Sequence, residues 1–580
     1  MLKLIKKLNR YQLLLIVISI GFIAFQVYLD LKIPDYMNEI TTIVQKKGTV
    51  SDVMNPGSKM ILCAFGSLIS AFVVGYFAAY IAASFARNLR SDIFNSVMDY
   101  GMEEIKGFST SSLITRTTND VNQISILIAM GLQVIIKAPI MAIWAISKIS
   151  GKSYEWSIAT SGAIVILLIM ILLIVLVALP KFKKIQMLTD NLNRITRENL
   201  TGIRVVRAYN AEDFQEEKFE NANTVLTDTH LFTGKLMAIM SPMMSFVMST
   251  LSLSIYFIGA YLINDATFPG KIGLFSDMVV FSAYAMQVVM AFMMVSLIFV
   301  IYPRASVSAK RINEVLGTES SIKEGNVSSG KEIGTVEFKN VSFKYADAEE
   351  ELLSDITFKI NKGETVAFIG STGSGKSTIV NLIPRFYDAT SGEVLVDGVN
   401  VKDYKEKTLF DKIGYISQKP ILFKGTIKDN VSFGTFMEEE KIKEAIKVAQ
   451  GEDFVLSMPN TYDESLAEAG TNISGGQKQR ISIARAIAKN PEIYIFDDSF
   501  SALDYKTDKV LRSELKKYTK GATTIIVAQR IGTIKDADKI FVVEDGKIVS
   551  SGTHKELIKN SSVYKEIALS QLSKEEIENE

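Results

Sequence analysis

The stretch that decides the fold of half of this chain is Gly370-Ser-Thr-Gly-Ser-Gly-Lys376-Ser377-Thr378. It follows Thr365–Ile369, an apolar run typical of a buried strand, and it opens a helical pattern. A phosphate-binding loop requires this context. Its glycines let backbone N–H groups converge on phosphate oxygens, while Lys376 would reach the terminal phosphates and Ser377 would ligate Mg²⁺. The residues predicted to hold the phosphates are Gly370, Thr372, Gly373, Ser374, Gly375, Lys376, Ser377 and Thr378.

Two further motifs complete a nucleotide site. Ile493-Tyr-Ile-Phe-Asp497-Asp498 is an apolar strand that ends in two carboxylates, and Asp497 would hold the water shell of Mg²⁺. Ser474-Gly475-Gly476-Gln477 precedes a helix, where a hydroxyl and backbone N–H groups could receive a γ-phosphate. The dinucleotide fingerprint competes poorly with this interpretation, because the glycine spacing differs and Lys-Ser follows the loop.

Composition divides the chain into a membrane half and a soluble half. The 580 residues exceed one domain of roughly 150 residues. Long apolar runs fill residues 1–300, whereas strand-like and helical stretches alternate after residue 334, as in an α/β domain. The net charge of +1 gives no basic surface for nucleic acid. The single cysteine, Cys63, excludes a disulfide within the chain.

Six stretches are apolar enough to span a membrane, which takes about 20 residues each. They cover residues 12–30, 60–83, 125–147, 156–179, 243–263 and 278–302. The links after the second and fourth spans are long, charged and helical in pattern, so we expect helical hairpins that project into the cytoplasm. The first apolar run is longer than a signal-peptide core and is interpreted as a retained span. Lysine and arginine after the fourth span place these links inside.

The predicted fold is a multidomain membrane protein with an all-α six-helix transmembrane domain and an α/β nucleotide-binding domain. The predicted boundaries are residues 1–316 for the transmembrane domain, 317–334 for a linker, 335–572 for the nucleotide-binding domain and 573–580 for an acidic tail.

Together these motifs resemble the ATP-binding cassette exporters along nearly the whole chain. The resemblance implies that Tyr345 stacks on adenine, that Gln418 joins Ser377 and Asp497 at Mg²⁺, and that Asp504 belongs to the loop that crosses a dimer. It also implies ATP as the nucleotide. Asn119-Asp120 and the segment 202–209 resemble the intracellular loops, and Ser474–Gln477 is the family signature.

The sequence departs from the family at two catalytic positions. Asp498 stands where the family has the glutamate that polarises water, and Gln529 stands where it has the switch histidine. Aspartate is one methylene shorter, and a misplacement of about 1 Å can cost about a hundredfold in rate. Glutamine cannot carry the proton that histidine carries. Because the signature is intact, the pattern is similar to one subunit of a bacterial heterodimeric multidrug exporter in the plasma membrane. Neutral drift in a slow homodimer is the alternative.

Evidence about the transported compound is weaker. The fifth and sixth spans are rich in methionine, which suits promiscuous apolar ligands but also ordinary packing. Lys137 lies near the middle of the third span, where it could contact substrate or make a structural hydrogen bond. We expect a hydrophobic or amphipathic substrate, with a peptide or lipid as alternatives and a nucleotide-gated channel as a different class. The candidate substrate residues are Lys137, Met244, Met248, Met286 and Met290.

Overall fold

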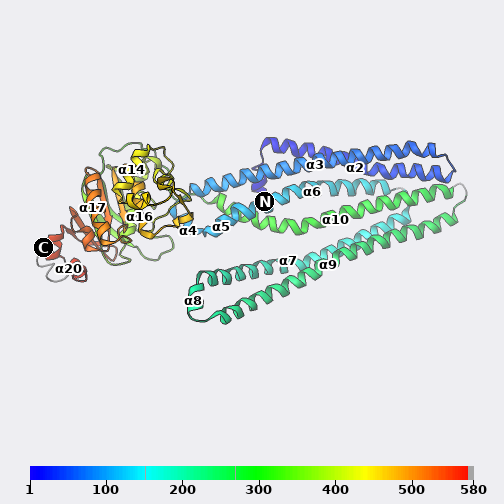
Figure 1. Cartoon of the computed structure of the whole chain (residues 1–580). Helices are drawn as coiled ribbons and strands as arrows, with labels where there is room; N and C mark the ends of the chain where they lie inside the picture. Colours follow the sequence, from blue (N-terminus) through cyan, green and yellow to red (C-terminus); the bar gives the residue numbers. More distant parts are fainter. Residues whose placement is uncertain (151, 268–269, 572–580) are drawn as a thin grey trace. The chain divides into compact units, whose positions relative to one another are not determined.

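The computed structural model describes residues 1–150, 152–267 and 270–571 (Figure 1). They form two compact units. The helical unit comprises Met1–Met98 and Ser109–Thr318, and the α/β unit comprises Asp99–Phe108 and Glu319–Glu580. The predicted domain boundaries stay a prediction, and the predicted acidic tail lies outside the described residues.

The helical unit contains six helices that are long and apolar enough to cross a membrane, counted over the described residues. Five of the six predicted spans lie within one of them, and the sixth, residues 278–302, overlaps the candidate span Gly270–Val295 and extends beyond it. The helices of this unit are α1 (Leu2–Ile5), α2 (Arg10–Gln45), α3 (Val50–Met98), α5 (Thr110–Thr115), the π-helical turn η1 (Arg116–Asp120), α6 (Val121–Ile149), α7 (Tyr154–Thr201), α8 (Ile203–Ala208), α9 (Glu212–Asp265) and α10 (Gly270–Gly317).

Helix α7 shows why these segments suit a lipid environment. Three of its apolar side chains are each more than half exposed, namely Ile169, Leu172 and Leu176. Exposure of such side chains to water costs free energy, whereas exposure to lipid hydrocarbon does not. The opposite side of the helix is buried, and Trp156 packs on Phe281 with ring centroids 5.3 Å apart. The helix therefore has one face for its neighbours and one for lipid.

The turn η1 is fixed to α10 by polar contacts. Arg116 donates to Glu314 Oε2 at 2.9 Å, and Ser308 donates to Asp120 Oδ1 at 2.7 Å. Both Arg116 and Asp120 are buried. Short π-helical turns often occur at functional sites, and this one lies where the sequence resembles an intracellular loop.

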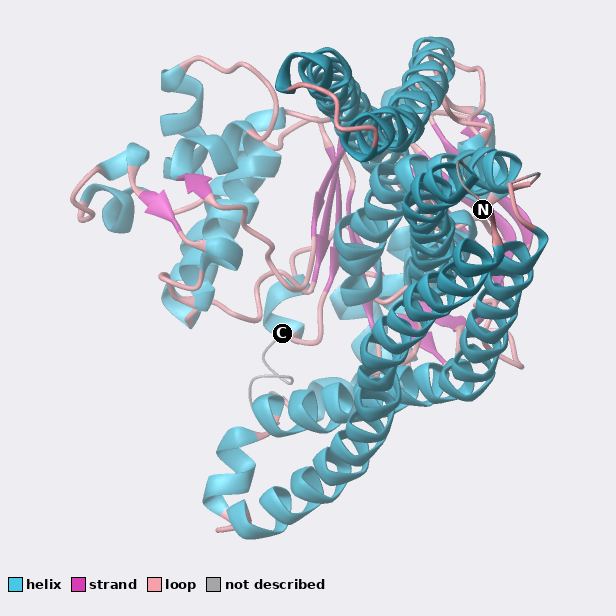
Figure 2. Cartoon of the chain, turned by 90° about the vertical axis from the view of Figure 1, so that its right-hand side faces the viewer, coloured by secondary structure: helices cyan, strands magenta, loops and turns pink. Residues whose placement is uncertain are grey.

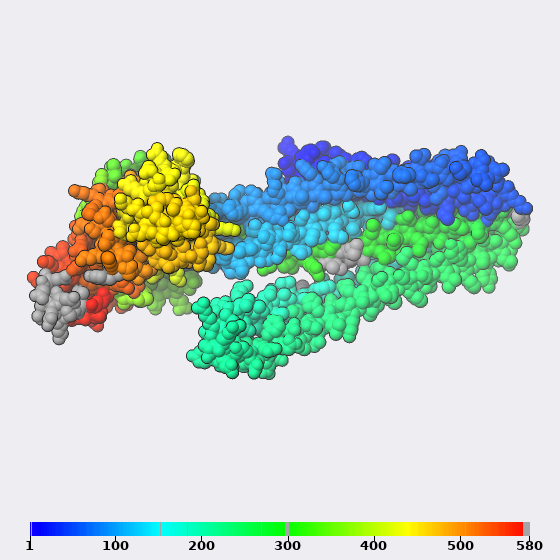
Figure 3. Space-filling view, viewed as in Figure 1, coloured from blue at the N-terminus to red at the C-terminus, as the bar shows by residue number. Residues whose placement is uncertain are grey.

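Helices α7, α8 and α9 form a long hairpin that diverges from the rest of the helical unit toward its α8 end (Figures 1 and 3). A cavity of about 880 Å³ lies beside the hairpin, between residues 186–202, at the end of α7, and the segment 109–119, with Arg311 of α10 also at its wall. Its lining is polar and charged. Such a surface does not suit hydrocarbon, so this end of the hairpin belongs outside the membrane.

The α/β unit contains every strand that the structure describes (Figure 2). One sheet has the order β2-β1-β4-β5, a second has β12-β11-β3-β10-β9-β6, and β7 pairs with β8. The strands are β1 (Val336–Phe343), β2 (Leu353–Ile360), β3 (Thr365–Ile369), β4 (Ser391–Val396), β5 (Val399–Asn400), β6 (Ile413–Ile416), β7 (Gly425–Thr426), β8 (Ser465–Leu466), β9 (Ile493–Asp497), β10 (Thr523–Val527), β11 (Lys539–Glu544) and β12 (Lys547–Gly552).

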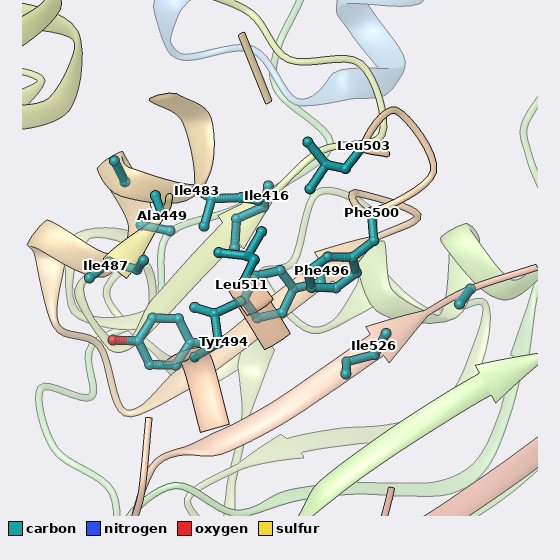
Figure 4. Packing of buried hydrophobic residues seen from close by; sticks show 14 of the residues in the cluster. Ile416, Ala449, Ile483, Ile487, Tyr494, Phe496, Phe500, Leu503, Leu511 and Ile526 are labelled. Atoms are coloured by element: carbon teal, nitrogen blue, oxygen red, sulfur yellow. The ribbon is translucent and has the colours of Figure 1, made fainter. Parts of the chain in front are cut away.

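Helices pack against the larger sheet and seal its core. Figure 4 shows Phe496 and Phe500 packed beside Leu511 in one buried cluster. The helices of this unit are α4 (Met102–Gly107), α11 (Lys376–Leu382), η2 (Val401–Asp403), α12 (Glu406–Lys412), α13 (Ile427–Ser432), α14 (Glu439–Val448), α15 (Glu452–Leu456), η3 (Thr461–Asp463), η4 (Glu468–Gly470), α16 (Gly475–Lys489), α17 (Tyr505–Tyr518), α18 (Ile531–Ile534), α19 (His554–Asn560) and α20 (Ser562–Leu569).

Parallel pairing of β3, β10 and β9 positions the site. Ile526 of β10 pairs with Ala367 of β3 on one side and with Phe496 of β9 on the other. The carboxyl ends of these strands therefore lie at the same edge of the sheet, where ligands bind in open α/β sheets. The glycine loop follows β3, and the two carboxylates end β9.

A partly buried ion-pair network joins the four-stranded and six-stranded sheets of the α/β unit. Lys412 Nζ lies 2.7 Å from Asp397 Oδ2 and 2.9 Å from Glu492 Oε2. Asp397 is fully buried and also accepts a hydrogen bond from the backbone of Thr335. Removing the cation would leave a buried carboxylate without its partner, which is strongly destabilising.

We therefore expect Lys412→Met to lower the free energy of unfolding by about 3 kcal/mol. Lys443→Met is the matched control, because Lys443 pairs with the exposed Glu439 and Glu440, and it should cost less than about 1 kcal/mol. Denaturant unfolding of the detergent-solubilised chain, followed by fluorescence, measures both. Equal losses in the two variants would contradict the prediction.

Candidate nucleotide-binding site

Two glycines of the loop between β3 and α11 lie where a side chain would not fit. Gly375, at the N-cap of α11, has φ 96°, and a Cβ there would lie 2.6 Å from Leu353 Cδ2. A Cβ on Gly370 would lie 2.0 Å from the carbonyl oxygen of Val543. Only glycine fits both positions, and the loop can therefore wrap closely around a ligand.

Lys376 lies inside the loop rather than in solvent. Its Nζ donates to the carbonyl oxygens of Gly370, at 3.0 Å, and Ser371, at 2.6 Å, and to Ser374 Oγ at 3.2 Å. The side chain is buried, and this burial lowers the pKa of the ammonium. An anion in the loop would favour the charged form, so phosphate binding and protonation of Lys376 support each other.

Asp497 and Ser377 meet at the predicted metal position. Ser377 Oγ donates to Asp497 Oδ1 at 2.7 Å. Asp497 is buried, and burial raises the pKa of its carboxyl. A hydroxyl beside a carboxylate is an all-oxygen donor pair of the kind that Mg²⁺ prefers. The two residues therefore fit the cation, whose charge would keep Asp497 ionised.

Tyr415 also contacts Asp497, and no sequence motif predicts this contact. Its hydroxyl lies 3.2 Å from Asp497 Oδ2 and 2.9 Å from Asn381 Oδ1, so its single proton is shared between these two acceptors. Burial raises the pKa of the phenol above its usual value, so it stays a donor. Tyr415 lies in the middle of β6, and no motif marks it. Only the pairing of β6 with β9 brings it to the carboxylate.

Asp498 has two amide donors on the same oxygen. Gln418 Nε2 and Gln529 Nε2 each donate to Asp498 Oδ2, both at 3.1 Å. Burial raises the pKa of the Asp498 carboxyl. Asp498 is therefore in direct contact with both Gln418 and Gln529, and these are the three positions that the sequence identified separately.

Tyr345 belongs to an aromatic cluster beside the loop. Its ring makes T-shaped contacts with Phe343, at 4.8 Å between centroids, and with Tyr387, at 5.3 Å. Its hydroxyl lies 3.1 Å from Thr378 Oγ1, at the end of the glycine loop. A nucleotide with phosphates on the loop would place its base near this ring.

The signature segment lies elsewhere in the described structure. Ser474 caps α16: Gln477 N donates to Ser474 Oγ at 3.3 Å, and Ser474 N donates to Gln477 Oε1 at 2.8 Å. No hydrogen bond between described residues joins this segment to the loop 370–378. Its neighbour is instead the loop before α17, where Asp504 caps the helix by accepting from Thr507 N. Gly475 and Gly476 begin α16, and Ser474 and Gly475 are exposed.

Comparison with known proteins identifies the family. Residues 353–501 match the ABC transporter family, and residues 15–292 match the ABC transporter transmembrane region. An uncharacterised ABC transporter ATP-binding protein of Mycobacterium tuberculosis is 36% identical over 93% of both chains. The chain belongs to the ABC transporter family. As an ABC exporter, it is a multi-pass membrane protein in which ATP hydrolysis is coupled to transport.

Other relatives of this ABC exporter have varied descriptions. YfiB of Bacillus subtilis, an uncharacterised ABC transporter ATP-binding protein, is 35% identical over 90% of both chains. The ATP-dependent lipid A-core flippase of Pseudomonas fluorescens is 30% identical over 87% of this chain and 83% of its own. The structure of a bacterial Atm1-family ABC exporter with ATP bound has the same fold, with a TM-score of 0.84 and 22% identity over 98% of this chain and 99% of that one.

The candidate substrate residues of the exporter are not equivalent in the structure. Met244 is buried, Met248 and Met286 are partly buried, and Met290 is 48% exposed. Lys137 forms an ion pair with Asp30 at 3.4 Å, and Asp30 also accepts from Ser67. This pairing gives Lys137 a structural role between α6 and α2, and its contact with substrate stays a prediction.

We predict that Tyr415→Phe weakens Mg²⁺-ATP binding about three- to tenfold, because one hydrogen bond that fixes Asp497 is lost. Tyr494→Phe is the matched control: the Tyr494 hydroxyl is buried and, among the described residues, has no hydrogen-bond partner. Titration of a fluorescent ATP analogue at several Mg²⁺ concentrations measures both. If the two variants bind alike, Tyr415 does not position the metal ligand.

Proposed function

We propose that this exporter is the degenerate-site subunit of a bacterial heterodimeric exporter in the plasma membrane, with its nucleotide-binding domain in the cytoplasm. The observation that carries the proposal is the pair of amide donors on one oxygen of Asp498. A general base must lie within hydrogen-bond reach of the water that it activates. Here the shorter carboxylate is held by Gln418 and Gln529 instead.

The side chain at the switch position supports the same conclusion. Gln529 is an amide, which donates a hydrogen bond but does not titrate, whereas histidine exchanges protons near neutral pH. The backbone of Gln529 is also held, since Gln571 Nε2 donates to its carbonyl oxygen at 2.7 Å. The site thus retains its phosphate-binding loop and its metal ligands but has weaker catalytic groups.

In the proposed site, this chain's residues bind and hold the nucleotide. Tyr345 stacks on the base, the backbone N–H groups of residues 370–378 and Lys376 bind the phosphates, and Ser377, Gln418 and Asp497 hold Mg²⁺. The cation neutralises phosphate charge. A site that binds ATP with these residues but has a weak catalytic carboxylate keeps its ATP longer. It therefore holds the two nucleotide-binding domains together longer than a site that hydrolyses ATP quickly.

The partner chain completes both composite sites in this proposal. The Ser474–Gln477 segment, in which Ser474 and Gly475 are exposed, receives the γ-phosphate of the nucleotide on the partner, where a glutamate and a histidine catalyse hydrolysis. Asp504 lies in the loop beside the shared interface. A slow homodimer and a nucleotide-gated channel are the alternatives, and the homodimer predicts that two copies of this chain hydrolyse ATP without a second, different chain.

For the cargo, we propose hydrophobic or amphipathic compounds, including drugs. The methionine-rich α9 and α10 support this class, because methionine adapts to ligands of different shape. Two relatives are named lipid A-core flippases, which keeps a lipid as the second candidate. A peptide is the third.

The first test compares the purified chain with the chain co-purified with its partner. We expect ATP hydrolysis and ATP-dependent dye accumulation in inverted vesicles only for the pair. Asp498→Ala should change the activity of the pair little. Fast hydrolysis by the chain alone would rule out the heterodimer, and ion flux without ATP consumption would favour the channel.

The second test restores the catalytic groups. In a pair whose partner lacks its catalytic glutamate, we expect Asp498→Glu with Gln529→His to raise ATP hydrolysis on the order of tenfold or more, because the longer carboxylate reaches the water. Asp498→Asn with Gln529→His is the control without a carboxylate and should stay inactive. Equal rates in the restored and unrestored pairs would show that these residues do not limit hydrolysis.

A further inference from the structure

A lysine from the segment between two membrane-crossing helices covers the ring proposed to receive adenine. Lys106 of α4 lies with its Nζ 4.3 Å from the ring centroid of Tyr345 and 5.1 Å from that of Tyr387. Both distances are within the range of cation–π attraction, about 6 Å. Residues 99–108 belong to the same compact unit as the rings, although the chain connects them to α3 and α5.

The segment 99–108 is held in this place by more than the lysine. Glu104 Oε1 accepts from the backbone N–H of Ser321 at 3.1 Å. A Cβ on Gly101 would lie 3.2 Å from Ile322 Cδ1, so the backbone passes close to that side chain. The position of Lys106 is therefore part of a packed arrangement.

The ammonium lies at the distance that a stacked base would need. Aromatic rings stack with centroids about 4.5 Å apart or more, and the Lys106 Nζ is at 4.3 Å from the Tyr345 centroid. T-shaped contacts with Phe343 and Tyr387 fix the plane of the Tyr345 ring. The ring cannot easily turn its covered face away from the lysine.

We propose that Lys106 competes with the adenine base for the face of Tyr345, so that binding of ATP displaces the lysine and releases this contact of the segment 99–108. The inference rests on the proposed base-binding role of Tyr345. The competition would connect adenine binding to the segment 99–108, which joins α3 to α5. Because binding linkage is reciprocal, any change that draws Lys106 from the ring would also favour ATP.

A hydrogen bond to Tyr387 adds to the attachment of Lys106. This bond raises the pKa of the Lys106 ammonium, with further contributions from the nearby Tyr345 and Asp347. The lysine is therefore charged at neutral pH, as cation–π attraction requires. Lys106 is otherwise exposed, so its displacement leaves the ammonium in water without a desolvation cost.

The experiment measures the binding of ATPγS and of inorganic tripolyphosphate to the full-length chain in nanodiscs. Tripolyphosphate has no base, so the ratio of the two dissociation constants removes any general effect of a lost positive charge. We expect Lys106→Met to improve the ratio in favour of ATPγS about two- to fivefold. Lys106→Arg, which keeps the cation, should behave like the wild type, and Lys339→Met is the control for an exposed lysine elsewhere in the unit.

Variants of Tyr345 separate this inference from the proposed site. Tyr345→Ala should weaken the binding of ATPγS but not the binding of tripolyphosphate. In the Tyr345→Ala background, Lys106→Met should not change the ratio of the two dissociation constants. If Tyr345→Ala leaves ATPγS binding unchanged, the base-binding role of Tyr345 fails, and the inference fails with it. If Tyr345→Ala weakens binding while Lys106→Met leaves the ratio unchanged or lowers it, only the competition is overturned.

Discussion

The hydrogen bond from Ser377 to Asp497 is the contact on which the nucleotide site of this exporter depends. It joins the first turn of α11 to the end of β9, and it exists because β3 and β9 both pair in parallel with β10. Parallel order places the carboxyl ends of these strands at one edge, and the loop after β3 then faces the carboxylates after β9. A change of register in β10 would separate the hydroxyl from the carboxylate and with it the two halves of the metal position.

Around this contact, the residues expected to bind phosphate and metal are closely held by their neighbours. The residues at the expected catalytic positions differ from those of the family. Lys376 is enclosed by oxygens of its own loop, and Tyr415 holds the second oxygen of Asp497. The neighbouring Asp498 instead shares one oxygen between two glutamine amides. Burial raises the pKa of both carboxyl groups. Asp497 is buried and Asp498 is partly buried, so the two carboxylates differ both in their partners and in their exposure to water.

Much of this arrangement could be predicted from local patterns. The six spans follow from apolar length, and the glycine loop and the strand before Asp497 follow from short motifs whose geometry is set by neighbouring residues. Tyr415 could not be found in this way, since it approaches Asp497 only through the pairing of β6 with β9. The contacts of Asp498 with Gln418 and Gln529 were also beyond the sequence, which identified all three positions but not that they meet. The predicted domain boundaries stay a prediction, and no local pattern indicates that residues 99–108 cluster with the α/β unit, because this clustering depends on long-range contacts.

The position of Lys106 bears on how a slow site could still serve transport. A site that binds ATP without fast hydrolysis contributes through occupancy alone, so its effect on the membrane helices must come from contacts that differ between the occupied and unoccupied states. The glycine loop and Asp497 lie within the α/β unit and have no direct covalent link to α3 or α5. The segment 99–108 has such a link at both ends, and Lys106 brings it to the ring proposed for the base. If adenine takes the place of Lys106 on the Tyr345 ring, the segment 99–108 loses this contact without ATP hydrolysis. ATP binding alone could therefore change how α3 and α5 are held.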